Sequence, residues 1–407
     1  MKVLLSDGSG LTARQCATRL AADGHPVEAL APDPLCLCRF TRAVRRVRRV
    51  PPYGSDPIRW LTAAVGLYRS GRFDVLFPTL EQVAVLSWAR DTLHDVGVAT
   101  AVPPFSSVAA VQDKVSAYAT LDRLGIPQPA SAVDAADWDL FPAFVKEPIG
   151  TASGGVRRVS GPRKLAAAAN GKTVLIQAAT PGALVMCQSV FDDGSIRAFH
   201  ACQRIAEGAS GGASHKLSVS LPEVGRWLEL LGTELRWHGA LSADVILSGD
   251  GPVFIDLNPR LVEPENAFIS GVDLVGAMME LATGGHPLHQ PEGRAGTATH
   301  QLLLALLGAA QHGEGRRKIA AELVHAARRT DGYRTSLEEL TPLHHDPKAL
   351  IPLVMATAAT LVAPGTWRWF TSGSVANYAL SDEGWHKLLA TDPAGSFPAG
   401  YTSPLST

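Results

Sequence analysis

The 407-residue chain is long enough for two or three domains, and its 46% hydrophobic and 18% charged residues are typical of a globular protein. The formal net charge of −1 argues against a polyelectrolyte that binds nucleic acid or an anionic surface through its overall charge. The five cysteines contain no CxxC pair, which indicates reduced thiols rather than a zinc site. The first residues are too briefly apolar for a signal peptide, so we expect a cytoplasmic protein.

Apolar runs and helical patterns alternate through the first hundred residues. Short apolar runs end in Gly, Asp or Pro, and segments with helical spacing connect them. Such alternation predicts a parallel sheet with crossover helices, in a first domain that covers residues 1–105. The expected strands are residues 2–6, 26–33 and 74–79, and the expected helices are residues 12–24, with Thr12 as N-cap, and 56–73.

Six arginines gather in residues 39–50, with hydrophobic residues threaded between them. The run is short, and with Phe40 as its one aromatic residue it lacks the interleaved aromatic side chains that accompany nucleic-acid binding surfaces. We expect an amphipathic surface segment, or a patch that faces an anionic substrate.

The middle of the chain changes character. One helix is expected over residues 106–125, and strand signals joined by Gly- and Asp-rich turns dominate from residue 141 onward, which favours a mixed or antiparallel region. A helix over residues 223–237 leads to a hairpin whose turn is SGDG at residues 248–251.

Polar residues occupy alternate positions of the second hairpin strand, VFIDLNPRL, residues 253–261. Asp256, Asn258 and Arg260 should therefore point the same way, with Asp244 on the partner strand. Two carboxylates and an amide oxygen suit magnesium, which completes its coordination with phosphate and water, and an arginine can bind the phosphate. The alternative is a buried ion pair between Arg260 and Asp256.

Two lysines precede this hairpin. Lys146 lies on an apparent inner strand and is followed by GTASGGV, residues 150–156, a loop whose backbone N–H groups could approach a phosphate. No GKS or GKT follows, so this is not a Walker loop, and an ordinary hairpin turn is the alternative. Lys114 lies in VQDKVSAY, where a solvated helix lysine is equally consistent with the pattern.

Together, these motifs occur in an order that resembles the ATP-grasp superfamily. The order is DK, VK with a Gly-rich loop, IQAATPG, GGAS, an acid and DLNPR. Residues 203–219, QRIAEGASGGASHKLSV, are similar to the subset that contains carbamoyl-phosphate synthase large subunits and amino-acid ligases. The resemblance implies an α/β and α+β protein with a Rossmann-like pre-ATP-grasp domain at 1–105, an ATP-grasp domain of two α+β subdomains at 106–290 and a helix-rich region at 291–407.

The resemblance also implies roles for individual residues. ATP would lie between the two subdomains, with Mg²⁺, or alternatively Mn²⁺, between its phosphates and the hairpin. Residues implied to bind ATP are Lys114, Lys146, Ser153, Gly154, Gly155, Gln177, Ala178, Thr180 and Leu184. Those implied to hold the metal are Asp244, Asp256 and Asn258, and those implied to act in catalysis are Arg260, Arg204 and Lys216.

This chain departs from the family at two places. Leu184 stands where many members have a glutamate that holds the ribose hydroxyls, so another contact must replace it. Both metal carboxylates are Asp, where Glu is common. After the hairpin, Glu263 and Glu265 are placed to contact a substrate amine, although a surface turn would also explain them.

The function that this resemblance implies is ATP-dependent carboxylate–amine ligation. An amino acid or a similar small acid would be phosphorylated by ATP with release of ADP, and an amine would attack the acylphosphate with release of phosphate. The partners would be these small molecules, with no nucleic acid or membrane, and a homodimer is compatible with the family.

Three alternatives remain at this stage. They are an ATP-grasp phosphotransferase that stops before ligation, a non-catalytic nucleotide-binding protein, and an NAD(P)-binding oxidoreductase. The last rests on the fingerprint GSGLTA at residues 8–13 and on Asp33.

The last hundred residues contain no motif. Their longest apolar run, residues 349–364, is shorter than a membrane span and contains Pro352, so we expect a buried helix.

Overall fold

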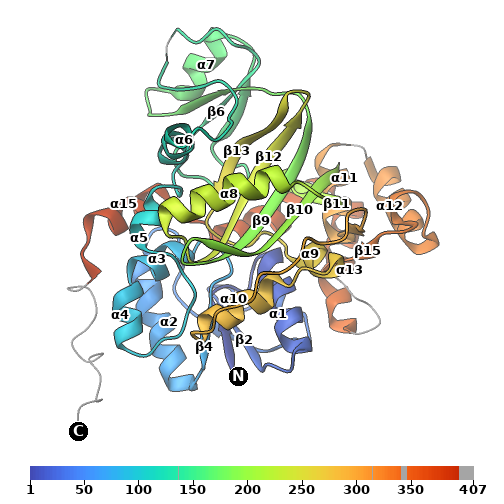
Figure 1. The fold of residues 1–407 in the computed structure, drawn as a ribbon. Helices are drawn as coiled ribbons and strands as arrows, with labels where there is room; N and C mark the ends of the chain where they lie inside the picture. The colour runs from blue at the N-terminus through green and yellow to red at the C-terminus, as the bar shows by residue number, and fades with distance from the viewer. Residues whose placement is uncertain (136, 314, 341–345, 394–407) are drawn as a thin grey trace.

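The computed structural model describes residues 1–135, 137–313, 315–340 and 346–393, which form three sheets with helices around them (Figure 1). The first sheet has the order β3-β2-β1-β4, and all its strands are parallel. The predicted parallel sheet with crossover helices is therefore confirmed. Its strands are β1 (Val3–Leu5), β2 (Val27–Ala31), β3 (Val44–Arg49) and β4 (Val75–Phe77), and its helices are α1 (Leu11–Ala22), α2 (Pro57–Gly71), α3 (Val83–Trp88) and α4 (Arg90–Asp95).

The arginine run contains a strand, β3, that the sequence pattern did not predict. Val44 is buried, whereas Arg45, Arg46 and Arg49 are exposed, because β3 is the edge strand of the sheet. Arg48 donates to Glu28 on β2 over 2.5 Å. The amphipathic surface segment is present, but as a sheet edge.

The predicted cap of the first helix is wrong. Helix α1 begins at Leu11, and its N-cap is Gly10, so Thr12 is already in the first turn. The Thr12 hydroxyl instead accepts a hydrogen bond from the backbone N–H of Glu263, at 3.1 Å. The Thr12 side chain therefore forms a long-range tertiary contact and does not cap the helix.

The predicted single helix over residues 106–125 is also wrong, because it divides into α5 (Phe105–Ala109) and α6 (Lys114–Arg123). Asp113 separates them and caps α6: its carboxylate accepts from the N–H groups of Val115 and Ser116. Aspartate satisfies the free N–H groups of a new helix better than it fits a helix interior.

A small antiparallel sheet of order β5-β8-β6-β7 follows and carries α7 (Pro162–Ala169) on one side, at the top of Figure 1. Its own core is a small group of buried apolar residues that includes Val145, Val159 and Ile176. The strands are β5 (Ser131–Val133), β6 (Ala143–Lys146), β7 (Val156–Val159) and β8 (Leu175–Ala178).

The third sheet has seven strands in the order β13-β12-β9-β10-β11-β14-β15. The predicted hairpin is confirmed: β12 ends at Ser248 and β13 starts at Gly251. Bounds are β9 (Ala183–Asp192), β10 (Ser195–Glu207), β11 (Ala213–Val219), β12 (Gly239–Ser248), β13 (Gly251–Asn258), β14 (Ala298–His300) and β15 (Leu337–Glu338), with helices α8 (Pro222–Leu235), α9 (Glu265–Ser270) and α10 (Leu274–Ala282).

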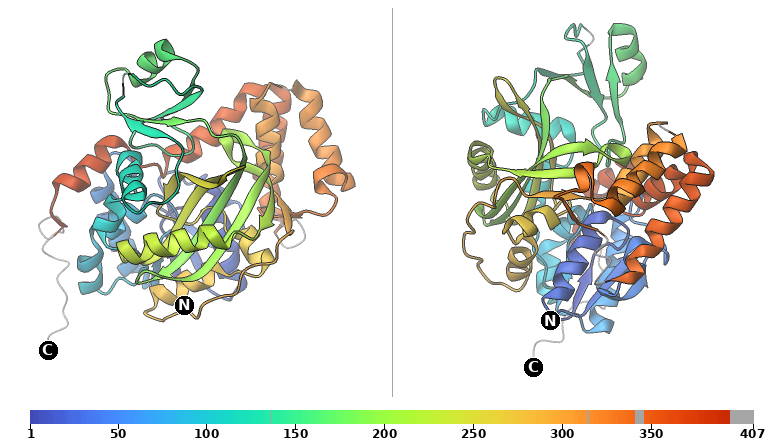
Figure 2. Two further views of the ribbon diagram at one scale, coloured as in Figure 1. Left: turned by 45° about the horizontal axis from the view of Figure 1, so that its top comes forward. Right: turned by 90° about the vertical axis from the view of Figure 1, so that its right-hand side faces the viewer.

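The C-terminal helices lie beside the N-terminal domain in the right-hand view of Figure 2. The region expected to be helix-rich also supplies β14 and β15 to the large sheet. Its helices are α11 (Leu302–Gln311), α12 (Gly315–Arg328), α13 (Leu350–Val362), α14 (Trp367–Ala376) and α15 (Asp382–Ala390).

Helix α13 corrects the expectation of a buried helix at residues 349–364. Leu353 and Ala356 are buried, but Ile351, Val354 and Met355 on the other face are 43%, 59% and 53% exposed. Within the part of the chain that the structure describes, no helix combines the length and the apolar character that crossing a membrane requires.

Candidate active site

The predicted metal ligands lie on one face of the seven-stranded sheet. Asp256 is directly opposite Asp244, and Asn258 is opposite Ser242. Residues that face each other across a sheet, and residues two apart along one strand, share a face. Asp244, Asp256 and Asn258 therefore project from the same side, and the predicted convergence from two strands is confirmed.

A β-bulge separates the apolar end of β13 from its polar end. The register passes from Phe254 directly to Asp256, which leaves Ile255 without an opposite residue. The freed Ile255 carbonyl accepts a hydrogen bond from Lys146 Nζ at 2.5 Å. A bulge commonly redirects the backbone next to a functional site, and here it gives the small sheet a direct contact with the strand that carries the predicted metal ligands Asp256 and Asn258.

Lys146 is buried and has a second acceptor, Gln177 Oε1, at 2.8 Å. Burial lowers the pKa of its ammonium, and Lys114 lowers it further, whereas Asp256 and Asp244 oppose the shift. The charges of Lys114, Asp256 and Asp244 therefore all act on Lys146. Lys114 Nζ donates to the Gly150 carbonyl at 3.0 Å, so it rests against the start of the Gly-rich loop.

The loop over residues 150–155 turns back on itself. The Gly154 N–H donates to the Thr151 carbonyl at 2.9 Å, and Gly150 packs so closely on Gly154 that a Cβ there would lie 2.1 Å from the Gly154 oxygen. Ala152 and Ser153 have left-handed φ values of 51° and 63°. Such a tight turn needs its glycines and concentrates backbone groups in a small volume.

This loop reaches the loop that connects β10 and β11. A Cβ on Gly211 would lie 3.3 Å from Ser153 Oγ. Arg204 extends to the same place, because its Nη1 donates to the Gly211 carbonyl at 2.8 Å, and it also pairs with Glu207 at 3.2 Å. The small sheet and the seven-stranded sheet therefore approach each other at two places, Lys146 with Ile255 and Ser153 with Gly211.

The two aspartates suit a divalent cation. The pKa of Asp244 is raised to about 7, first by desolvation and second by the neighbouring Asp256 charge, while Arg260, Lys146 and Arg204 oppose the shift. Two adjacent carboxylates in a partly buried site are stabilised when a cation lies between them. The donors present, two carboxylates and an amide oxygen, are the hard oxygen ligands that magnesium prefers.

Arg260 follows β13 and does not pair with Asp256, so the simple ion-pair alternative is wrong. Its Nε donates to Glu81 at 3.1 Å, and its Nη2 donates to Asn258 Oδ1 at 3.2 Å. Glu81 is buried and also accepts from Gln112 at 3.1 Å. Sequence reasoning missed Glu81, whose only signal is its position just beyond the strand β4.

Lys216 lies in a different environment from the other predicted catalytic residues. Its ammonium is buried between Glu263 and Glu339, at 2.6 and 2.7 Å. Glu339 also accepts from Gln15, Thr299 and Gln301. The two carboxylates raise the pKa of Lys216 far above its usual range despite burial, so this lysine stays charged.

The predicted adenine segment begins inside a sheet and ends outside it. Strand β8 is paired on both sides, and the N–H of Ala178 donates to the Ala130 carbonyl at 2.8 Å. Gln177 is turned toward Lys146, as described above. Thr180 follows the strand, and Leu184 is opposite Ile246 at the start of β9. The backbone groups of β8 are thus already used in the sheet, and the backbone groups after residue 179 are better candidates for contact with an adenine base.

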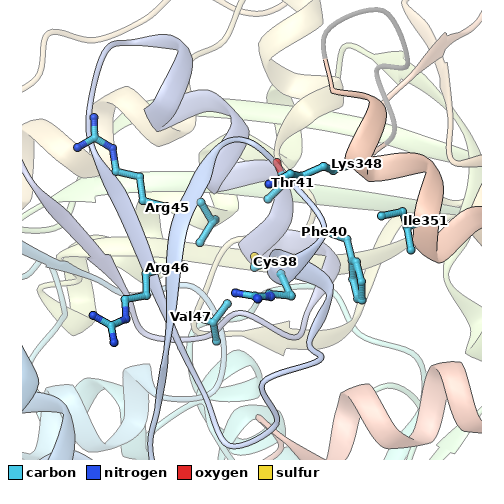
Figure 3. A pocket seen from close by; sticks show the side chains of 10 residues that line it. Cys38, Phe40, Thr41, Arg45, Arg46, Val47, Lys348 and Ile351 are labelled. Carbon is cyan, nitrogen blue, oxygen red and sulfur yellow. The ribbon is translucent and has the colours of Figure 1, made fainter.

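A cavity of about 320 Å³ lies elsewhere, between β3 and the start of α13. Figure 3 shows Arg45 and Arg46 on the β3 side of it and Phe40, Lys348 and Ile351 on the α13 side. None of the predicted site residues lines it. The cavity is therefore separate from the candidate active site.

No protein-family model matches the chain, and no curated protein matches it in sequence. Solved structures do match in fold. The ADP complex of PurK, N5-carboxyaminoimidazole ribonucleotide synthetase, has a TM-score of 0.60 and 13% identity over 77% of this chain and 85% of its own.

Two further structures match similarly. The biotin carboxylase domain of 2-oxoglutarate carboxylase from Hydrogenobacter thermophilus has a TM-score of 0.56 and 17% identity over 73% of each chain. An L-amino acid ligase from Bacillus licheniformis has a TM-score of 0.54 and 14% identity over 70% of this chain and 75% of its own. The chain therefore has the ATP-grasp fold, as its motifs predicted.

Proposed function

We propose that this protein is an ATP- and Mg²⁺-dependent carboxylate–amine ligase that acts on a small acid such as an amino acid. The observation that carries the proposal is the convergence of Asp244, Asp256 and Asn258 on one sheet face, with Lys146 bonded to the bulge beside them. Structural neighbours with bound ADP or MgADP support the choice of nucleotide and metal.

Asp244, Asp256 and Asn258 would hold Mg²⁺, which neutralises phosphate charge when it is bound. Lys114 and Lys146 would bind the phosphates beneath the loop that contains Ser153, Gly154 and Gly155. Backbone groups around Gln177, Ala178 and Thr180 would border the adenine, and Leu184 would give the ribose an apolar neighbour in place of an acid.

The reaction needs phosphoryl transfer and then amide formation. A substrate carboxylate oxygen attacks the γ-phosphorus, the bond to the bridging oxygen breaks, and ADP leaves. The amine then attacks the acyl carbon, phosphate departs, and the amine proton is lost to water. Arg260, held by Glu81, and Arg204, which donates to the Gly211 carbonyl, would stabilise the charge that develops on the transferred group.

Lys216 is better suited to a supporting role. Its ammonium is fully engaged by Glu263 and Glu339, so it has little capacity for a substrate contact unless one of those pairs breaks. We infer that it fixes the position of Glu263 after the metal-binding hairpin.

The oxidoreductase alternative loses its main support. In the GSGLTA turn, the N–H groups of Ser9 and Gly10 already donate to the Asp7 carboxylate, at 2.7 and 2.8 Å. A dinucleotide pyrophosphate would need such groups and would be repelled by this acid. A phosphotransferase remains the second candidate function, since the residues for phosphoryl transfer are the same in both reactions.

Nucleotide turnover tests the proposal. Incubation with MgATP and pooled amino acids and small carboxylates should release ADP and phosphate only when one acid and one amine are both present. A stable phosphorylated product without an amine would favour the phosphotransferase, and nucleotide binding without any turnover would favour a non-catalytic role. Cytoplasmic location and a homodimer belong to the same proposal; one structural neighbour is described as a dimer.

A further inference from the structure

The start of α13 is fastened to the N-terminal domain by one buried carboxylate. Asp346 accepts hydrogen bonds from the Thr41 hydroxyl and from the Arg42 N–H, the latter at 2.9 Å. Arg14 on α1 pairs with the same carboxylate oxygen at 3.3 Å. Each of these bonds joins positions more than 300 residues apart, so the segment that begins α13 is held against the loop before β3.

The cavity of about 320 Å³ lies beside this contact and is lined from both segments. Residues 38–41 and 44–47 line it on the N-terminal side, and Lys348 and Ile351 line it on the α13 side. In Figure 3, Lys348 extends from α13 toward Thr41, whereas Arg45 and Arg46 extend outward from β3 at the rim. Small-molecule sites have volumes of about 300–1,000 Å³. The cavity therefore has the size of such a site, and its two walls are held together by Asp346.

The lining of this cavity is cationic. Four of its ten residues carry a positive charge and none is Asp or Glu; the four are Arg39, Arg45, Arg46 and Lys348. All four are exposed, and none forms an ion pair or a side-chain hydrogen bond with another residue of the described ranges. Their charges are therefore available to an anion from solution.

Two neighbouring arginines that do not line the cavity are neutralised by carboxylates. Arg48, also on β3, pairs with Glu28 at 2.5 Å, and Arg14 pairs with Asp346. The fold thus supplies acids to these two arginines and supplies none to the lining of the cavity. Positive charges that gather around a concave surface without a counter-charge concentrate anions there.

We propose that this cavity binds a small organic phosphate, at a site separate from the candidate active site. The planar fork of an arginine binds phosphate through two parallel hydrogen bonds, and a lysine binds it as a point charge. Arg39 and Lys348 would contact the phosphate from the two walls, and Phe40 and Ile351 would contact the carbon skeleton. The proposal does not depend on the ligase function, because no predicted site residue lines the cavity.

The lining favours a small molecule over a nucleic-acid strand. A strand needs aromatic side chains on which successive bases stack, along a groove that follows its backbone. Among the described residues of the lining, Phe40 is the only aromatic one, and it is partly buried. A nucleotide and a sugar phosphate both match the chemistry of the cavity, so both serve as probes.

Calorimetric titration of the full chain tests this site with adenosine 5′-monophosphate, ribose 5-phosphate and adenosine, without ATP or metal. We expect at least one of the two phosphates to bind the wild-type protein, and adenosine to bind more weakly than its monophosphate. The tighter phosphate identifies the ligand as a nucleotide or a sugar phosphate. Its Kd should rise about tenfold or more in the double variant Arg39→Ala/Lys348→Ala, which removes a charge from each wall. Added NaCl should weaken binding to the wild type.

Lys164→Ala/Arg317→Ala is the matched control, because it removes the same charge from exposed positions that do not line the cavity. Lys146→Ala alters the candidate active site instead, and in both controls the Kd should stay within about twofold of wild type. Equal affinity in the cavity variant and wild type would overturn the proposal, as would binding that only Lys146→Ala weakens. A wild-type protein that binds neither phosphate, or that binds only a short single-stranded RNA, would overturn it as well.

Discussion

The proposed metal site and the C-terminal side of the candidate active site are built in different ways. The first comes from a single hairpin, where Asp244, Asp256 and Asn258 are placed by strand alternation and one turn. The second joins distant residues: Lys216 pairs with Glu339, and Ser374 bonds to Ser9, 365 positions away. Local geometry therefore fixes the proposed chemistry, whereas tertiary packing fixes the surroundings that would select the substrate.

This contrast implies that breaking the buried ion pairs that join distant residues should mainly affect stability. Lys216→Met leaves Glu263 and Glu339 close together with no cation, and breaking a buried pair on one side costs about 3–5 kcal/mol. Thermal and urea unfolding should show a loss of this size. Lys318→Met is the control, because the Lys318 side chain is 49% exposed and pairs with Glu322 one helical turn away, and helical pairs at the surface contribute about 0.5 kcal/mol. Equal losses in the two variants would contradict the contrast.

Substitution at the proposed metal site should instead reduce turnover and leave stability largely unchanged. Asp256→Asn keeps the shape of the side chain and removes one of two adjacent negative charges, so unfolding should be unchanged or slightly shifted upward. Turnover should fall by about 10²–10³-fold, as when one group that stabilises transition-state charge is lost. Asp250→Asn, in the exposed turn of the same hairpin, should leave kcat unchanged. If the Asp256→Asn protein is unfolded, Asp256 has a structural role and the proposed role in metal binding is contradicted.

A buried histidine extends the comparison to pH. His200 lies on the same sheet face and bonds through Nε2 to Asn266 at 2.7 Å; burial lowers its pKa from 6.5 to about 4. Between pH 6.5 and pH 4 this histidine is protonated in the unfolded chain but not in the folded protein. Its effect on the free energy of unfolding is therefore absent above pH 6.5, and the free energy of unfolding falls by about 3 kcal/mol as the pH drops to 4.

Unfolding measured from pH 7 to pH 4 checks this expectation. His200→Gln should remove this contribution to the acid sensitivity, whereas His94→Gln should not, because the His94 side chain is 90% exposed. Identical pH profiles for all three proteins would show that His200 titrates normally.

The smallest expected effect concerns the lysine between the two sheets. Lys146→Ala should weaken MgATP binding about tenfold, which corresponds to one charge-assisted contact of roughly 1.4 kcal/mol. Calorimetric titration with ATP measures it, and Lys164→Ala is a control on a surface lysine that bonds only to Ser160 among the described residues. Unchanged ATP affinity in Lys146→Ala would contradict the assignment of Lys146 and the adjacent Gly-rich loop to the nucleotide site.

Sequence patterns predicted what depends on neighbours in the chain. The parallel sheet, the hairpin and the convergence of Asp244 with Asp256 and Asn258 all follow from periodicity and turn residues. Patterns did not predict β3, because the arginines of this edge strand interrupt the hydrophobic alternation that indicates a strand. They also did not predict the bulge at Ile255, which depends on how β13 pairs with β12.

The same limit applies to the side chains that surround the site. Glu81 and Glu339 are single acids in unremarkable local sequence, and only the fold brings them to Arg260 and Lys216. The position of Thr12 before a helical pattern predicted a helix cap. Its actual partner, the backbone N–H of Glu263, is 251 positions away and cannot be predicted from the neighbouring residues.

Oxygen transfer tests the central claim most directly. Substrate acids labelled with ¹⁸O in the carboxylate are incubated with MgATP, and the released phosphate is analysed by mass spectrometry. The proposed acylphosphate passes one carboxylate oxygen to phosphate, so ADP and singly labelled phosphate should appear together. Unlabelled phosphate, or AMP with pyrophosphate, would contradict the account.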